Sequence, residues 1–161
     1  MSNLIQAILN IVNSTQIKIG TMTTGNNRAN NMGDGLEEYI KNIFANTINE
    51  TNEQKRLETF SHVYSYHGNK NNPPDLILKN SDAIEIKKLE SYNTAIALNS
   101  SYPKAKLFSN STMITTACRG CEANWIEKDM LYVIGNVPKN TNKYQIESDN
   151  NFMDKRQVNI F

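Results

Sequence analysis

An aspartate, a glutamate and a lysine lie close together in the sequence, in an order that suits phosphodiester hydrolysis. Asp75 follows Pro74, and nine residues separate it from the run Glu85-Ile86-Lys87. Cleavage of a phosphodiester needs a metal ion that neutralises charge on the scissile phosphate and activates a nearby water. Two carboxylates suit Mg²⁺, which binds through oxygen and keeps several of its waters. A lysine beside them can orient or help deprotonate that water, or stabilise the developing charge.

The spacing predicts a β-hairpin that brings these three side chains to one face. Two short strands, Asp75 to Lys79 and Ala83 to Lys88, are predicted, and side chains alternate between the faces of a strand. A three-residue loop, Asn80-Ser81-Asp82, would pair Asp75 with Lys87, whereas a two-residue turn would point Asp75 to the other face. The other pairs of the predicted register are Ile77 with Glu85 on the same face, and Leu76 with Ile86 and Leu78 with Ile84 on the apolar face.

A helix upstream of the hairpin carries a further carboxylate. It is predicted from about Asp34 to Ile48, with Asp34 as its N-cap and an apolar stripe at helical spacing. Glu37 lies at the edge of this stripe and Glu38 on the opposite side, so Glu37 is the preferred fourth catalytic residue. Capping of the helix by Glu37 is the alternative. The stripe consists of Leu36, Ile40, Ile43 and Phe44.

The remaining pattern predicts one α/β domain over residues 1–161, without internal repeats. A short amphipathic helix is predicted over residues 3–12, and a strand over Phe60 to Tyr66, where large rings alternate with small residues. The run Gly68 to Pro74 is predicted as a loop. Buried strands are predicted over Met113 to Ala117 and Met130 to Ile134, and the interval from Ser91 to Ser111 as a loop or short helix.

Composition leaves the function open. The net charge is +1, from 17 basic and 16 acidic side chains, whereas a nucleic-acid binder usually has a basic excess. The apolar runs are too short to cross a bilayer, and the amino terminus resembles no secretory signal, so a cytoplasmic protein is expected. Candidate contacts to DNA phosphates or bases are Lys88, Lys104, Lys106 and Arg119.

The two cysteines, Cys118 and Cys121, form one Cys-x-x-Cys motif. A structural zinc site normally needs four ligands, and both histidines, His62 and His67, lie far upstream. A thioredoxin-like motif would need its own strand and helix around it. We therefore interpret the pair as reduced structural thiols beside a turn and predict no metal there.

The chain resembles the NgoPII family of type II restriction endonucleases, within the PD-(D/E)xK nuclease superfamily. The resemblance implies a restriction-endonuclease-like mixed β-sheet flanked by helices, with Mg²⁺ ligands on Asp75 and Glu85 and the catalytic lysine at Lys87. It also implies cleavage of double-stranded DNA at a short GC-rich palindrome (GGCC), a homodimer, and a cognate DNA methyltransferase as genetic partner. The matching stretches are Arg28 to Tyr39, Gly68 to Lys88, Ala97 to Lys104 and Lys128 to Gly135.

Members of that family are longer than this chain, so the resemblance implies a C-terminally truncated member with a single, incomplete domain. Two other functions remain open at this point. One is an inactive fragment that serves at most as a DNA-binding or interaction module. The other is a repair or recombination nuclease with the same site. A surface hairpin with solvated charges is the alternative that involves no catalysis.

Overall fold

The computed structural model describes residues 4–13, 28–69, 71–89, 104–136 and 158–160. Their strands form one six-stranded mixed sheet in the order β1-β2-β3-β5-β4, with β6 also paired to β5. In chain order the elements are α1 (Leu4–Asn13), α2 (Arg28–Phe44), α3 (Glu53–Val63), β1 (Tyr64–Asn69), β2 (Asn72–Leu78), β3 (Ala83–Leu89), β4 (Lys106–Phe108), α4 (Thr116–Arg119), β5 (Glu127–Asn136) and β6 (Val158–Ile160).

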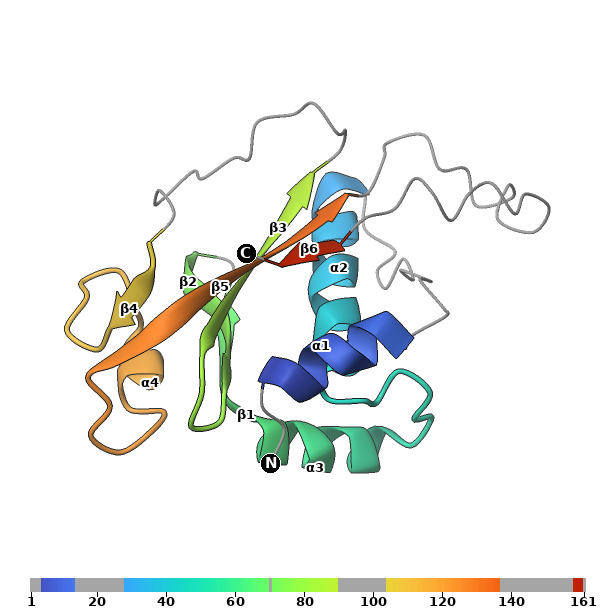
Figure 1. Ribbon diagram of the computed structural model, residues 1–161, viewed down its shortest axis with the longest axis horizontal. Coiled ribbons are helices and arrows are strands. Elements are labelled where there is room, and N and C mark those ends of the chain that lie inside the picture. The colour runs from blue at the N-terminus through green and yellow to red at the C-terminus, as the bar shows by residue number, and fades with distance from the viewer. Residues whose placement is uncertain (1–3, 14–27, 70, 90–103, 137–157, 161) are drawn as a thin grey trace.

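The pairing confirms the predicted α/β class, a restriction-endonuclease-like mixed sheet flanked by helices. Strands β1, β2 and β3 are successive antiparallel neighbours, while β3 and β5 run parallel, with Ala83 opposite Met130 and Leu89 opposite Asn136. Helices α1, α2 and α3 lie on one side of the sheet, and α4 lies on the other, near the edge strand β4 (Figure 1). None of the described helices is long and apolar enough to cross a membrane.

Two apolar clusters, one on each side, hold the sheet in place. The larger packs α2 and α3 against alternate residues of β2 and β3, and the predicted stripe of α2 is confirmed as its centre. The smaller lies under α4 and β4 and takes the intervening residues Ile77 and Ala83. Strand alternation therefore gives each face of the hairpin its own core. The four buried residues of the α2 stripe are Leu36, Ile40, Ile43 and Phe44.

The helices differ from prediction mainly in where they begin. Helix α2 starts at Arg28, so Asp34 lies inside it and the predicted N-cap is wrong. Helix α1 is confirmed, and it packs through Ala7 and the partly buried Ile11. Ala7 is buried, whereas Ile5 and Val12 are exposed.

The strand predicted over Phe60 to Tyr66 is wrong in its first half. Those residues end α3, and β1 starts at Tyr64. Helix α3 begins at the N-cap Asn52, whose side chain accepts a hydrogen bond from Lys55 N at 3.2 Å. Rings at Phe60 and Tyr64 are four residues apart, a spacing that suits a helical face as well as a strand.

Two further predictions fail near turns. Most of the predicted Gly68 to Pro74 loop belongs to strands, because β1 continues to Asn69 and β2 begins at Asn72. The buried strand predicted over Met113 to Ala117 is also wrong. There, the Thr115 side chain accepts a hydrogen bond from Cys118 N at 3.0 Å and caps the short helix α4. The strand predicted over Met130 to Ile134 is confirmed as part of β5.

Candidate active site

The hairpin between β2 and β3 has the predicted loop length but a different register. Its turn comprises Lys79-Asn80-Ser81, because Leu78 N donates to Asp82 O at 3.0 Å. Asn80 has a φ of 56°, in the left-handed region that asparagine tolerates. Leu76 lies opposite Ile84 rather than Ile86, so the predicted pairing is wrong by two residues. A two-residue shift preserves the face of every side chain, whereas one residue would reverse it.

Asp75 lies just past the end of this pairing and turns its carboxylate toward β3. Its Oδ2 accepts a hydrogen bond from Ile86 N at 2.6 Å. Burial and the nearby charge of Glu85 raise the pKa of Asp75 from 3.8 to about 7, against the lowering effect of the Ile86 bond. The two carboxylates are thus close enough to repel each other when both are ionised.

Glu85 and Lys87 project from the same face of β3 and form an ion pair. Lys87 Nζ donates to Glu85 Oε1 at 2.6 Å, and the two side chains are 25% and 11% exposed. Burial alone would lower the pKa of Lys87, but the hydrogen bond and charge of Glu85 outweigh it and raise that pKa. Lys87 is therefore an ammonium at neutral pH. Glu85 Oε2 is buried and makes no hydrogen bond with any described residue.

The structure distinguishes Glu37 from its neighbour Glu38. The charge of Glu37 contributes to the raised pKa of Asp75, so this carboxylate lies within electrostatic reach of the hairpin. Glu38 instead bonds within its own helix, accepting from Asn42 Nδ2 at 2.8 Å and pairing with Lys41 at 3.4 Å. Glu37 is therefore the helix carboxylate whose charge acts on Asp75, and its catalytic role stays a prediction.

The donor set fits a hard divalent cation. Asp75 and Glu85, the acidic pair, bring a half-buried and a buried carboxylate together, and one oxygen of Glu85 has no hydrogen-bond donor among the described residues. A cation bound by both carboxylates would offset their repulsion and would give the buried Glu85 oxygen a partner. Within the described ranges no group of three or more His, Cys, Asp or Glu side chains is arranged around a metal position. Mg²⁺ is commonly held by one or two carboxylates and completes its shell with water.

Tyr132 is a neighbour of the acidic pair that the sequence reasoning missed. In the parallel pairing of β3 with β5, Tyr132 lies opposite Glu85. Its electrostatic effect contributes to the raised pKa of Lys87. The Tyr132 hydroxyl accepts a hydrogen bond from Lys104 N at 3.0 Å, which brings the exposed Lys104 to this part of the sheet. Only the pairing of two strands far apart in the sequence could have revealed this neighbour.

The other basic residues predicted to contact DNA have structural surroundings of their own. Lys88 is partly buried, and burial lowers its pKa. Lys106 pairs with Glu127 at 2.7 Å and with Asp129 at 3.1 Å on the surface. Arg119 is exposed, and its guanidinium donates to Ser111 O at 3.0 Å. Their contact with DNA stays a prediction.

Lys128 is a buried anchor for the hairpin turn. Its Nζ donates to Ser81 O at 2.8 Å and to Glu122 Oε2 at 2.6 Å, and the residue is 8% exposed. Lys128→Ala would leave the Glu122 carboxylate without its counter-ion, so we expect a loss of about 3 kcal/mol in the free energy of unfolding. Urea denaturation followed by circular dichroism measures it. Lys106→Ala, which breaks exposed ion pairs, is the control and should have a much smaller effect. Equal losses in the two variants would contradict a role for Lys128 as anchor.

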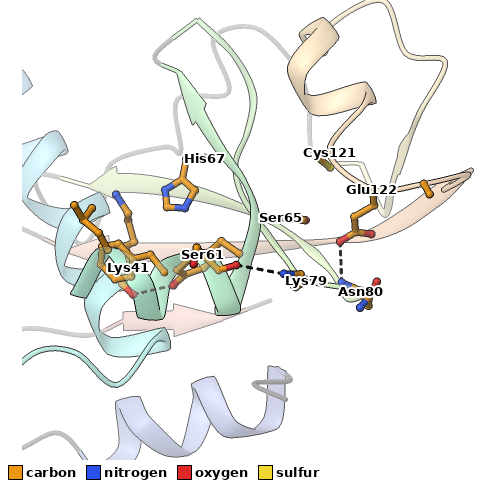
Figure 2. Close-up of a pocket in the computed structure, with 12 residues that line it drawn as sticks. Lys41, Ser61, Ser65, His67, Lys79, Asn80, Cys121 and Glu122 are labelled. Carbon is orange, nitrogen blue, oxygen red and sulfur yellow. Dashed lines mark hydrogen bonds between the residues drawn. The ribbon is translucent and has the colours of Figure 1, made fainter. Parts of the chain in front are cut away.

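A pocket of about 640 Å³ lies beside β1, α3 and the hairpin turn (Figure 2). His67 lines it, whereas the acidic pair does not. Polar groups in its wall bond to one another: Lys79 Nζ donates to Ser61 O at 3.3 Å, and Asn80 N donates to Glu122 Oε1 at 2.7 Å. The pocket is therefore separate from the candidate metal site, and these bonds help fix the turn.

The cysteines agree with a structural interpretation. Both thiols are free, and Cys118 is buried in the smaller apolar cluster. Burial raises the pKa of Cys118 to about 12, which keeps this thiol protonated and unreactive at neutral pH.

Comparison with known proteins assigns the family. A sequence model described as NgoPII restriction endonuclease matches residues 2–149. The chain belongs to the NgoPII restriction endonuclease family. It is 47% identical over 140 residues to the type II restriction enzyme NgoPII of Neisseria gonorrhoeae, an alignment that covers 87% of this chain and 50% of that enzyme. No solved structure matches the chain with significant similarity.

The matched region of the NgoPII family includes the whole β2–β3 hairpin and α2. The acidic pair, Lys87 and Glu37 therefore all lie inside the part that defines membership. The chain spans about half the length of the relative from Neisseria gonorrhoeae.

Proposed function

We propose that this chain is a Mg²⁺-dependent, site-specific endonuclease that hydrolyses phosphodiester bonds in double-stranded DNA at a short GC-rich palindrome, GGCC. The observation that carries the proposal is the acidic pair, whose carboxylates approach each other beside an ammonium held 2.6 Å from Glu85. Membership of the NgoPII family supports the same chemistry.

In this proposal Asp75 and Glu85 hold Mg²⁺, and Lys87 acts on the attacking water. When bound, the ion would neutralise charge on the scissile phosphate and lower the pKa of a coordinated water. The hydrogen bond from Ile86 N fixes one oxygen of Asp75 and leaves the other available as a ligand. The Lys87 ammonium has three N–H donors, and one of them donates a hydrogen bond to Glu85. The other two can orient the water or stabilise phosphate charge. Glu37 supplements the negative charge of the site from α2.

A palindromic DNA site is matched by two-fold symmetry in the protein, so the proposal includes a homodimer. It also includes a cognate DNA methyltransferase as genetic partner and action on DNA in the cytoplasm. Candidate phosphate or base contacts remain Lys88, Lys104, Lys106 and Arg119. Of these, Lys104 bonds through its backbone to Tyr132, the neighbour of Glu85, and is the first to test.

Incubation of the purified chain with plasmid DNA and Mg²⁺ tests the proposed function. We expect discrete fragments whose ends map to GGCC, and no cleavage in the presence of EDTA. A plasmid methylated at the cytosines of GGCC is the matched control and should remain intact. Failure to cut any DNA would identify an inactive fragment, while cleavage of nicked DNA or junctions without sequence preference would identify a repair or recombination nuclease. Either result would overturn the proposal.

A further inference from the structure

The pairing between strands β1 and β2 is irregular beside Asp75. His67 of β1 lies opposite Leu76 of β2, and Asn69 lies opposite Asn72. Between these pairs β1 contributes Gly68 alone, while β2 contributes the residues from Pro73 to Asp75. The extra residues of β2 form a bulge, and such a bulge redirects the side chains within it. Gly68 therefore faces the segment that carries the Asp75 carboxylate.

The missing side chain of Gly68 makes this close approach possible. A Cβ at position 68 would overlap the Pro74 carbonyl oxygen and would lie 2.9 Å from both Cα and the carbonyl oxygen of Asp75. All of these atoms belong to the backbone, so no rotation of a flexible side chain can relieve the overlap. The backbone of Asp75 itself would have to move.

We propose that Gly68 is a positioning residue for Asp75. By lacking a Cβ it lets β1 lie against the Pro74–Asp75 backbone, which holds the Asp75 carboxylate at 2.6 Å from Ile86 N. The inference rests on the proposed function only for the role of Asp75 as a metal ligand. Its geometric part concerns the bond to Ile86 and stands on contacts within the hairpin.

The variant Gly68→Ala tests the proposal, with Gly120→Ala as the matched control. A Cβ at Gly120 would meet only Thr116 O, at an ordinary contact distance of 3.6 Å. Two readouts are needed: the amide proton resonance of Ile86 by NMR, and the affinity for Mn²⁺ as a probe of the carboxylates. We expect Gly68→Ala to lose the downfield amide shift that a carboxylate acceptor produces and to bind Mn²⁺ about tenfold more weakly or worse. Gly120→Ala should match the unmodified chain in both.

A double-mutant cycle separates positioning from a general loss of stability. In the Asp75→Ala background, Gly68→Ala should cause no further loss of Mn²⁺ affinity, because the ligand that it displaces is already absent. An additive loss, or normal Ile86 and Mn²⁺ signals in Gly68→Ala alone, would overturn the proposal. If Gly68→Ala is unfolded in buffer, the measurements are made in trimethylamine N-oxide, which favours compact states. Failure to fold even there would assign Gly68 to the fold instead.

The same series distinguishes this inference from the proposed function. Wild-type Mn²⁺ affinity in Asp75→Ala would refute Asp75 as a ligand, and the Ile86 resonance would still test whether Gly68 positions the carboxylate. Loss of Mn²⁺ binding in Asp75→Ala, with normal binding in Gly68→Ala, would refute the positioning role alone.

Discussion

Glu85→Gln and Lys87→Met should each lower the rate of DNA cleavage at least about 10³-fold, with DNA binding largely retained. The two losses have different physical causes. Glu85→Gln removes a charged metal ligand, so the Mg²⁺ concentration for half-maximal activity should rise as the maximal rate falls. Lys87→Met removes an ammonium that lies 2.6 Å from Glu85 and competes with a cation for its charge. Metal affinity should therefore persist or increase while catalysis is lost.

Mg²⁺ titration of the cleavage rate, together with Mn²⁺ binding in the absence of DNA, separates these outcomes. Lys79→Met is the matched control, because Lys79 lies in the turn of the same hairpin and its ammonium bonds to Ser61 O. Its rate should stay within about twofold of the unmodified chain. Full activity in either Glu85→Gln or Lys87→Met would refute the assignment of the site.

Asp75→Asn should make the metal-free protein more stable at pH 8 and nearly unchanged at pH 4. Burial and the charge of Glu85 raise the pKa of Asp75 from 3.8 to about 7, so the folded chain binds this proton more tightly than the unfolded chain does. The resulting stability is complete below pH 4 and is lost as pH rises through about 7. The loss amounts to at most about 4 kcal/mol, and a neutral asparagine avoids it.

Thermal and urea unfolding in EDTA across pH 4 to 8 measure this difference. A divalent cation competes with the proton for Asp75, so Mn²⁺ affinity of the unmodified chain should fall about tenfold per pH unit below 7. Asp129→Asn, at a side chain that is 68% exposed, is the control and should change stability by less than about 0.5 kcal/mol. Lower stability of Asp75→Asn than of the unmodified chain at pH 8 would contradict the repulsion between Asp75 and Glu85.

Local pattern was sufficient to predict the elements that carry the site. The stripe of α2 and the alternation in the hairpin depend on near neighbours in the sequence, and both appear in the structure. The register differed by two residues because Asn80 adopts a left-handed conformation and shifts the turn by one position. Asp75 still lies on the predicted face of the hairpin, because the side chains of a strand repeat every two residues.

Features that depend on distant contacts could not be predicted in the same way. The end of helix α3 was predicted as a strand because the spacing of Phe60 and Tyr64 fits both kinds of element, and the tertiary packing of Phe60 and Val63 decides between them. Tyr132 was missed because its parallel strand partner is far away in sequence. The bulge opposite Gly68 was predicted as part of a loop, since prolines usually interrupt a strand.

Strands β2 and β3 follow each other directly in the sequence, and this implies an order in which the parts of the site fold. Closing a loop costs conformational entropy that grows with the length of the loop. Pairing β2 with β3 therefore costs less entropy than bringing β5 alongside β3. Contacts of low sequence separation also form faster. A nascent polypeptide that has emerged from the ribosome as far as β3 already contains both carboxylates and the amine. Docking of β5 is the long-range step that brings Tyr132 opposite Glu85, and we expect it to follow formation of the hairpin.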